Sequence, residues 1–455
     1  MRLPDGPAVA WYGDDFTGSA AVMEVLAFAG LPATLFFDLP RASELARFPG
    51  VLAIGVAGDA RTRSPEWMRA ELPRVFAGLR ALGAPLVHYK ICSTLDSAPR
   101  VGSIGAAAEI GLAAGGWAPL IVAAPQIGRW QAFGTLFARA GAAVHRLDRH
   151  PTMSVHPVTP MDEADVSRHV ARQTALGLGL VDLLELKAGR GADRLAAERS
   201  RGARIVAFDV VDDETLAEVG RLVWAAAEAE PPLFAIGSQG IEYALVAAWR
   251  AAGALPAAPP RPPVTPVARL AAVSGSCSPV TAEQIDRAAA AGFEAIAIDA
   301  AQAVDAAAWD RECARAEALA LASLGAGRSP IVATARGPGD PGIAACDRAR
   351  DAAGVTAEAF NARVGGGLGR LLDRLLRKTG VGRAVIAGGD TSSHGARELG
   401  LFALTAETAV AAGAALLRGH SEDQARDGLE ITLKGGQMGP SDFFIRIRDG
   451  GAAAA

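Results

Sequence analysis

The sequence predicts an α/β protein of two domains, each with a mainly parallel sheet flanked by helices. Short, continuous apolar runs alternate with amphipathic stretches in both halves of the chain, and such runs are typical of strands buried on both faces of a parallel sheet. The chain has 455 residues, too many for one ordinary hydrophobic core. Proline makes up half of residues 255–266, which predicts a semi-rigid linker between domains at 1–254 and 267–455.

The apolar runs give the expected strands in chain order. In the first domain they lie at 8–13, 33–37, 51–58, 86–92, 120–125, 204–210 and 233–238. In the second domain they lie at 269–276, 294–300, 330–336 and 383–390. Two last segments, 429–436 and 442–450, are separated by a turn-forming stretch and predict a closing hairpin or an antiparallel edge.

The composition excludes several classes of protein. A net charge of -4 argues against a general binder of nucleic acid or of an anionic membrane. No stretch is long and apolar enough to span a bilayer. Cys92, Cys277, Cys313 and Cys346 form no CxxC pair, so a disulfide framework or a zinc cluster is not expected. We therefore expect a cytoplasmic enzyme with reduced thiols.

Two adjacent aspartates, Asp14 and Asp15, follow the first predicted strand and precede a predicted helix. An ordinary helix N-cap accounts for one carboxylate. The second fits a polar ligand better, either as an acceptor for sugar hydroxyls or as a general base acting on an alcohol. The carboxyl ends of parallel strands are where ligands bind in open α/β sheets, so we expect Asp14 and Asp15 to be catalytic.

A second polar segment follows the predicted strand 86–92 and opens a helix at "GSIG", residues 102–105. A polar turn is one interpretation. The other is an anion site, in which cationic side chains meet a carboxylate while hydroxyls and helix amides complete the shell. Gln126 and Arg129, just past the run at 120–125, could reach the same cleft. The predicted substrate-binding residues are thus Lys90, Ser93, Thr94, Asp96, Arg100, Gln126 and Arg129.

Three loops rich in small residues in the second domain indicate a phosphate site. Each follows a predicted strand, so backbone amides could approach a phosphate closely. No Walker A pattern and no protein-kinase signature is present, so a nucleotide would use a different set of loops. Asp390 could touch a hydrated Mg²⁺. The predicted ATP-binding residues are Ser274, Ser276, Gly388, Gly389, Asp390, Thr391, Gly435 and Gly436.

These motifs together resemble the four-carbon acid sugar kinase family along nearly the whole chain. The resemblance rests on "DDFTG" (14–18), "YKICSTLDS" (89–97), "HPVTPM" (156–161), "GSCSPVT" (275–281), "GGDTSSH" (388–394) and "LKGGQMG" (433–439). It implies an acid-sugar-binding N-terminal domain, an ATP-binding C-terminal domain, reaction in the cleft between them, and ATP and Mg²⁺ as cofactors. The segment "CSTLDS" is similar to the form that accompanies 3-oxo-tetronate kinases, so the implied activity is phosphorylation of the terminal hydroxyl of a 3-oxo-tetronate.

Other functions stay open. The substrate could instead be D-threonate, D-erythronate or a branched 3-oxo acid. A non-catalytic sugar-acid sensor on the same fold would bind ligands without turnover. A nicotinamide-dependent dehydrogenase is disfavoured because no GxGxxG follows the first predicted strand. The expected partners are the acid sugar and ATP, with no nucleic acid and no membrane. The oligomeric state is left open, with a homodimer as one alternative.

Overall fold

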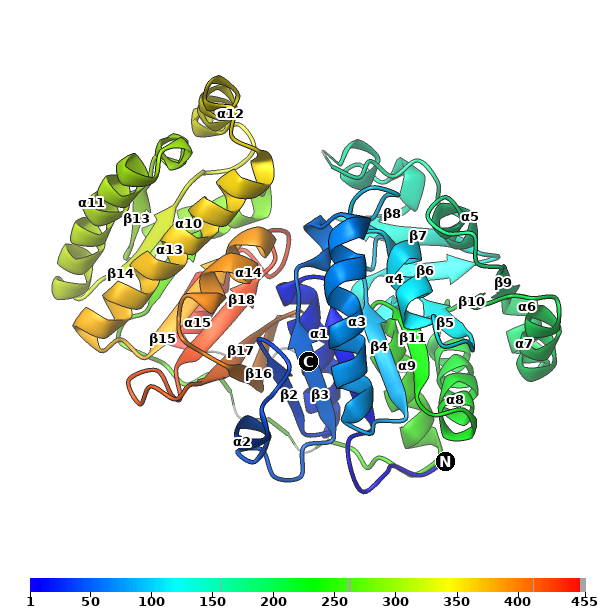
Figure 1. Cartoon of the computed structure of the whole chain (residues 1–455). Coiled ribbons are helices and arrows are strands. Elements are labelled where there is room, and N and C mark those ends of the chain that lie inside the picture. The colour runs from blue at the N-terminus through cyan, green and yellow to red at the C-terminus, as the bar shows by residue number, and fades with distance from the viewer. Residues whose placement is uncertain (157, 259, 262, 412, 451–455) are drawn as a thin grey trace. The chain divides into compact units, whose positions relative to one another are not determined.

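A computed structural model of the chain describes residues 1–450 except 157, 259, 262 and 412. Two compact units make up the chain, residues 1–259 and 260–455. Each unit has a mainly parallel sheet with helices packed against it (Figure 1). The predicted fold class is therefore confirmed. The Pro-rich segment contains Pro259 and Pro262, which lie outside the described residues.

The first unit is built on a parallel sheet in the order β2-β3-β1-β4-β11-β5-β10-β9. Its central strands are buried along their whole length, as their continuous apolar runs predict. Strand β9 was not predicted: it ends the strand order and its burial alternates, so it lacks the continuous burial of the central strands. The bounds are β1 Val9–Gly13, β2 Ala33–Phe36, β3 Ala53–Ala57, β4 Leu86–Lys90, β5 Ala118–Ile121, β9 Leu178–Val181, β10 Ile205–Phe208 and β11 Leu233–Gly237.

A small antiparallel sheet was not predicted. It consists of β6 (Arg129–Ala132), β7 (Thr135–Ala140) and β8 (Ala143–Arg146) in that order. Burial in β6 and β7 alternates, and β8 is largely exposed. A one-sided sheet of this kind has no continuous apolar run to reveal it.

Helices cover both faces of the first sheet. Helix α1 packs against α9 and against β2 and β3, whereas α3 packs against β1, β4 and α4. Helix α8 packs against α9. The bounds are α1 Phe16–Ala29, α2 Ala42–Leu45, α3 Pro65–Ala81, α4 Ile104–Gly111, α5 Val166–Ala171, α6 Leu183–Lys187, α7 Gly191–Ser200, α8 Asp213–Ala229 and α9 Gly240–Ala251, with short 3₁₀ turns η1 Ala60–Thr62 and η2 Pro125–Ile127.

The second unit has a sheet in the order β13-β14-β12-β15-β18-β17-β16. The first five are parallel, and β17 runs antiparallel to both of its neighbours. The bounds are β12 Ala271–Ser274, β13 Phe293–Ala297, β14 Ser329–Ala333, β15 Arg383–Ala387, β16 Ala403–Ala411, β17 Ala414–His420 and β18 Glu430–Lys434.

The predicted closing hairpin is wrong. Strand β18 pairs in parallel with β15, and residues 443–449 form helix α15 instead of a strand. Phe443, Phe444 and Ile447 are its buried residues, and this spacing lies on one helical face. The antiparallel edge is formed by β16 and β17, which the sequence reasoning missed.

The helices of the second unit also lie on both faces of the sheet. Helix α13 packs against α11 and α14, while α10 packs against α15. Their bounds are α10 Pro279–Ala290, α11 Ala306–Gly325, α12 Pro341–Ala353, α13 Ala357–Thr379, α14 Gly389–Arg397 and α15 Phe443–Asp449. Across the described residues, no helix has the length and apolar character needed to cross a membrane.

Candidate active site

The topology of the first unit gathers polar residues where the chain changes direction in the sheet. After β1 the chain builds β2 and β3 on one side, and then β4 on the other. Gly13 at the end of β1 lies opposite Lys90 at the end of β4. Asp14 and Asp15 come next along the chain, and Arg61 follows β3 in η1. The group therefore lies at a topological switch point, where open α/β sheets bind ligands.

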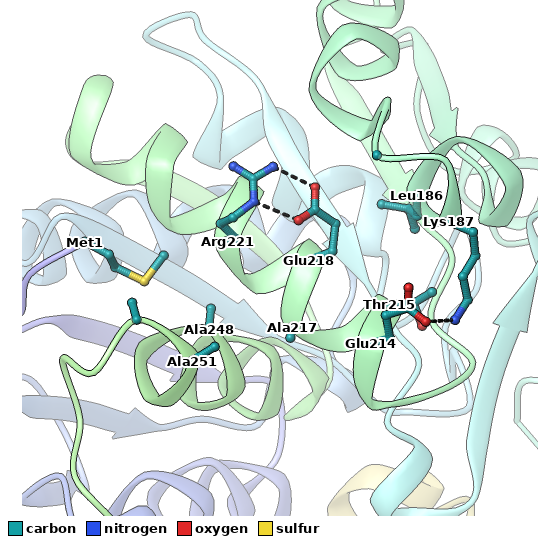
Figure 2. Close-up of a pocket in the computed structure, with 12 residues that line it drawn as sticks. Met1, Leu186, Lys187, Glu214, Thr215, Ala217, Glu218, Arg221, Ala248 and Ala251 are labelled. Carbon is teal, nitrogen blue, oxygen red and sulfur yellow. Dashed lines mark hydrogen bonds and ion pairs between the residues drawn. The ribbon is translucent and has the colours of Figure 1, made fainter.

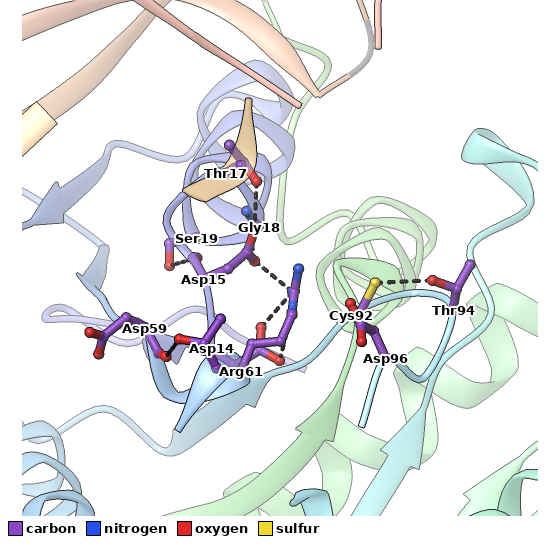
Figure 3. A network of polar contacts seen from close by, with 12 residues as sticks. Asp14, Asp15, Thr17, Gly18, Ser19, Asp59, Arg61, Cys92, Thr94 and Asp96 are labelled. Carbon is purple, nitrogen blue, oxygen red and sulfur yellow. Dashed lines mark hydrogen bonds and ion pairs between the residues drawn. The ribbon is translucent and has the colours of Figure 1, made fainter. Parts of the chain in front are cut away.

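Arg61 joins the two aspartates (Figure 3). Its Nη2 donates hydrogen bonds to Oδ1 of Asp14 and Oδ1 of Asp15, both at 2.6 Å, and its Nε donates to Oδ2 of Asp14 at 3.2 Å. The Asp14 and Asp15 side chains are only 3% and 14% exposed. One guanidinium thus bridges two nearly buried carboxylates.

The helix cap can now be assigned to Asp15. Its Oδ1 accepts a hydrogen bond from the Gly18 amide at 3.1 Å, and its Oδ2 accepts one from the Thr17 hydroxyl at 2.6 Å. Asp15 is the N-cap residue of α1. Asp14 does not cap the helix; it lies deeper, against Arg61.

The two carboxyls are held in different electrostatic states. Burial raises the pKa of Asp14, and the opposing charge of Arg61 does not fully offset it. Burial would also raise the pKa of Asp15, but the charges of Arg61 and Lys90 outweigh it, so this pKa lies below its ordinary value. A pair of carboxyls whose pKa values are pushed apart is typical of sites that use one group as a fixed charge and the other for proton transfer.

Lys90 is a buried cation without a partner. The residue is 2% exposed, and its ammonium makes no hydrogen bond or ion pair to any residue that the structure describes. A methyl group built on Gly18 would lie 2.6 Å from Nζ of Lys90 and 2.2 Å from Oδ1 of Asp15. The close approach of these groups therefore requires glycine at position 18, and the free ammonium is positioned to bind an anion.

The loop after β4 contains the other hydroxyl residues. The Thr94 hydroxyl lies 3.1 Å from Sγ of Cys92, and Ser93 is partly exposed. Leu95 is fully buried and has a φ of 53°, which is rare for a residue other than glycine. Asp96 accepts a hydrogen bond from the Thr159 hydroxyl.

Not every predicted substrate residue joins this group. Arg100 and Gln126 are exposed, and neither side chain makes a hydrogen bond to a described residue. Arg129 is partly buried, and its Nη1 donates to the Gly128 carbonyl at 2.9 Å. Its buried Nε has no partner among the described atoms, and it lies within electrostatic reach of Cys92.

The helix amides that were expected to complete the anion site, at the start of α4, have partners within the protein. The side-chain Oε1 of Gln173 accepts hydrogen bonds from the amides of Ile104, at 2.7 Å, and Gly105, at 3.4 Å. The Ser103 hydroxyl accepts one from Ala106 at 3.1 Å. These amides are already satisfied within the protein, so they have little capacity left for an anion.

Three functional candidates were missed by the sequence reasoning. Arg61 lies in "GDARTRS", directly after the predicted strand 51–58, and that position was the available signal. His156 and Thr159 lie in "HPVTPM": Nδ1 of His156 accepts the Thr159 amide hydrogen at 3.2 Å and lies 3.9 Å from Asp96. Pro157 in this motif lies outside the described residues.

In the second unit, the three predicted phosphate loops come together at the carboxyl ends of adjacent strands β12, β15 and β18. The Gly275 amide donates to the Ala387 carbonyl at 3.0 Å, and the Gly388 amide donates to the Lys434 carbonyl at 2.8 Å. A methyl group on Gly436 would lie 2.8 Å from the Ser276 hydroxyl. The structure therefore brings together Ser274, Ser276, Gly388, Gly389, Thr391, Gly435 and Gly436.

Helix α14 begins in the middle of these loops. Its N-cap residue is Gly388, which has a φ of 113° and offers no side-chain acceptor to the first amides of the helix. An uncapped helix N-terminus with glycine before it is a ready anion-binding site. Asp390 belongs to this first turn, and its side chain lies outside the part of the structure that is described.

A cavity of about 300 Å³ adjoins these loops. Gly275, Cys277 and Thr391 line it on the side of the loops, and Ile343, Phe360 and Val364 provide apolar walls. Asn361 contributes an amide. Asp347 and Arg350 also line the cavity, so it offers apolar walls to an aromatic base together with charged groups.

A larger groove in the first unit, about 630 Å³, lies between α6, α8 and α9 (Figure 2). Its cations are already paired: Lys187 contacts Glu214, and Arg221 donates to Glu218 at 2.7 and 2.6 Å. The charged side chains that line this groove are therefore paired with one another.

Among the residues that the structure describes, no three His, Cys, Asp or Glu side chains are grouped so that they could hold a metal ion. Mg²⁺ is usually bound by one or two carboxylates together with the phosphates of the substrate.

Comparison with known proteins defines the class. One family model, described as a sugar-binding N-terminal domain, matches residues 9–245, and another, described as a nucleotide-binding C-terminal domain, matches residues 271–444. The chain is 47% identical to a 3-oxo-isoapionate kinase of Paraburkholderia graminis, with 99% of this chain and 96% of the relative aligned. It is 31% identical to a 3-oxo-tetronate kinase of Methylobacterium radiotolerans, with 97% and 99% aligned.

The chain belongs to the four-carbon acid sugar kinase family, as its motifs predict. Solved structures support the fold. A Salmonella typhimurium LT2 protein matches with a TM-score of 0.76 at 21% identity, covering 96% of this chain and 98% of that one. A Haemophilus influenzae protein matches with a TM-score of 0.68 at 24% identity, covering 96% and 99%.

Proposed function

We propose that this protein is an ATP-dependent kinase that phosphorylates the terminal hydroxyl of a 3-oxo sugar acid. The observation that carries the proposal is the unpartnered ammonium of Lys90, buried beside the Asp14–Arg61–Asp15 group at a topological switch point. A carboxylate can bind this cation while the aspartates accept hydrogen bonds from hydroxyls. An acid sugar presents both kinds of group.

In the proposed substrate complex, Lys90 binds the carboxylate of the acid sugar. Arg129 could add a second cationic contact through its unpartnered Nε. Ser93 and Thr94 would hydrogen bond to sugar hydroxyls, and Asp96 would anchor this loop through Thr159. The exposed side chains of Arg100 and Gln126 are given no role.

Phosphoryl transfer requires positioning and charge neutralisation more than covalent chemistry by the protein. Asp15 is the more exposed of the two carboxylates and stays ionised, because Arg61 and Lys90 lower its pKa. We assign it to orient the attacking hydroxyl. Asp14, whose pKa is raised, is the candidate proton acceptor.

The second unit would bind ATP with its three loops around the triphosphate and its 300 Å³ cavity around the base. The amides that begin α14 would donate to phosphate oxygens. Mg²⁺, bound with the nucleotide, would neutralise charge on the phosphates, and Asp390 is the residue whose position in α14 suits contact with its hydration shell.

Sequence similarity favours one substrate over the one first expected. Identity to the 3-oxo-isoapionate kinase is 47%, against 31% to the 3-oxo-tetronate kinase, over nearly the whole chain in both cases. We therefore place 3-oxo-isoapionate first and 3-oxo-tetronates second. D-threonate, D-erythronate and other branched 3-oxo acids complete the set.

The test is a coupled ADP-release assay with MgATP and each of these acids. We expect the highest kcat/KM with 3-oxo-isoapionate, and loss of turnover with retained ATP binding in Asp15→Asn. Turnover restricted to D-threonate or D-erythronate would contradict the 3-oxo assignment. ATP binding without turnover on any acid would support a sensor in place of a kinase.

A further inference from the structure

Lys434 is a second buried cation without an acidic partner. It ends β18, is 0% exposed, and no carboxylate among the described residues lies within ion-pair distance of it. Its Nζ donates to Oγ1 of Thr281 at 2.9 Å and to the carbonyls of Gly435 at 3.0 Å and Gly436 at 3.2 Å. The charge is therefore hydrogen bonded but not neutralised.

The hydrogen bonds of Lys434 fix the orientation of the glycine loop. The Gly436 carbonyl also accepts from Thr281 Oγ1 at 2.8 Å, so both glycine carbonyls point inward. In a planar trans peptide, the amide N–H points away from the carbonyl of the preceding residue. The amides of Gly436 and Gln437 consequently point away from Lys434, and neither has a hydrogen-bond partner among the described residues.

The same lysine links two of the three phosphate loops. Thr281 lies in the first turn of α10, and its hydroxyl accepts a hydrogen bond from the Ser276 hydroxyl at 3.0 Å. Ser276 belongs to the loop after β12, whereas Gly435 and Gly436 belong to the loop after β18. Changing Lys434 would therefore disturb both loops.

Among the described residues, no ionisable side chain is hydrogen bonded or ion-paired to this ammonium. Helix α10 presents the hydroxyl of Thr281, the loop presents carbonyls, and α15 presents the ring of Phe443, whose centroid lies 5.8 Å from Nζ. Burial alone lowers the pKa of Lys434 to about 8. A polyanion bound next to this group would raise that pKa again, because it favours the charged form.

We propose that Lys434 is a buried counter-charge and positioning residue for the triphosphate of ATP, which turns the two free loop amides toward the phosphates and supplies positive charge behind them. This inference rests on the proposed nucleotide site of the second unit. It adds a cation that acts through the loop, where a Walker A lysine would reach the phosphates directly.

The test is calorimetric binding of MgATP to the full chain at about pH 8, in buffers of different ionisation enthalpy. With a pKa of about 8 in the free protein and a much higher one in the complex, binding takes up about half a proton. The Kd for MgATP should rise about tenfold between about pH 7 and about pH 9. Tight binding without proton uptake would overturn the inference.

Variants separate the charge from the hydrogen bonds. Lys434→Met should weaken MgATP binding and abolish proton uptake, whereas Lys434→Arg should abolish uptake while keeping the charge, because arginine stays protonated. Lys378→Met is the matched control: Lys378 is half exposed and pairs with Glu317 at 2.6 Å, and wild-type uptake is expected. Uptake that persists in Lys434→Arg would contradict the assignment.

Wild-type proton uptake decides the question even if Lys434→Met does not fold. If wild-type protein binds no MgATP at all, the nucleotide site under the proposed function fails first. That outcome differs from tight binding without proton uptake, which would overturn only the role of Lys434.

Discussion

Removing Arg61 should destabilise the first unit and abolish turnover. In Arg61→Gln, the carboxylates of Asp14 and Asp15 lose their shared guanidinium and three hydrogen bonds of 2.6, 2.6 and 3.2 Å. Both acids are nearly buried, so two like charges remain in a poorly solvated space. Removing one partner of a buried ion pair typically costs about 3–5 kcal/mol of the free energy of unfolding.

The loss should depend on pH in a defined direction. Without Arg61, the pKa values of both folded carboxyls rise above those of the unfolded chain, so the folded state binds more protons. The free energy of unfolding then increases as pH falls through the raised folded values toward about 3.9. The deficit relative to wild type should therefore be largest near neutral pH and smaller at about pH 5.

Urea unfolding followed by tryptophan fluorescence measures the free energy of unfolding of the first unit. Every tryptophan except Trp309 lies in residues 1–259. Arg221→Gln is the control, since Arg221 is 53% exposed and pairs with Glu218 within one helix; such a pair contributes about 0.3–0.5 kcal/mol. A loss below about 1 kcal/mol in Arg61→Gln, independent of pH, would refute the coupled arrangement of the two aspartates.

Two glycine substitutions test the two units separately. Gly18→Ala places a methyl group 2.6 Å from Nζ of Lys90 and 2.2 Å from Oδ1 of Asp15. Displacing these groups should lower kcat/KM about 100-fold, while the MgATP affinity measured by calorimetry should stay unchanged. An unchanged kcat/KM would argue against a site shared by Lys90 and Asp15. Gly388 has a φ of 113°, and in Gly388→Ala a methyl group would lie 3.3 Å from the Ser276 amide. We expect the free energy of unfolding to fall by about 1–3 kcal/mol and MgATP binding to weaken. Normal MgATP affinity would remove this loop from the nucleotide site.

Continuous apolar runs predicted most of the parallel strands correctly because those strands are buried on both faces, whereas β9, whose burial alternates, was missed. The same reasoning failed where a strand is buried on one side or where a short apolar segment has more than one periodicity. Strands β6, β7 and β8 are half exposed. Residues 443–449 have the composition of a strand, and only their buried positions identify them as one face of a helix. Local pattern alone does not settle such short segments.

The candidate site was predicted in part for a related reason. Asp15 and Lys90 were found because each directly follows or ends a strand, and parallel strands bring their carboxyl ends to one edge. Arg61 also follows a strand, but the sequence does not distinguish it from Arg63, which pairs with Asp59 instead. Arg100 was predicted because it is close to Lys90 in sequence, and the structure leaves its side chain exposed.

Each unit buries a lysine at the end of a sheet strand, Lys90 at the end of β4 and Lys434 at the end of β18. Neither forms an ion pair with a carboxylate that the structure describes. Burying a cation away from water reduces stability, and a packed core could avoid this cost with an apolar side chain. Unusual backbone lies beside each site: Leu95 has a φ of 53° and Gly388 a φ of 113°. Departures from local stability rules that gather at one place indicate a functional site. Because each unpaired charge is positive, the ligands that relieve these costs are anions, which is the property that an acid sugar and a nucleoside triphosphate share.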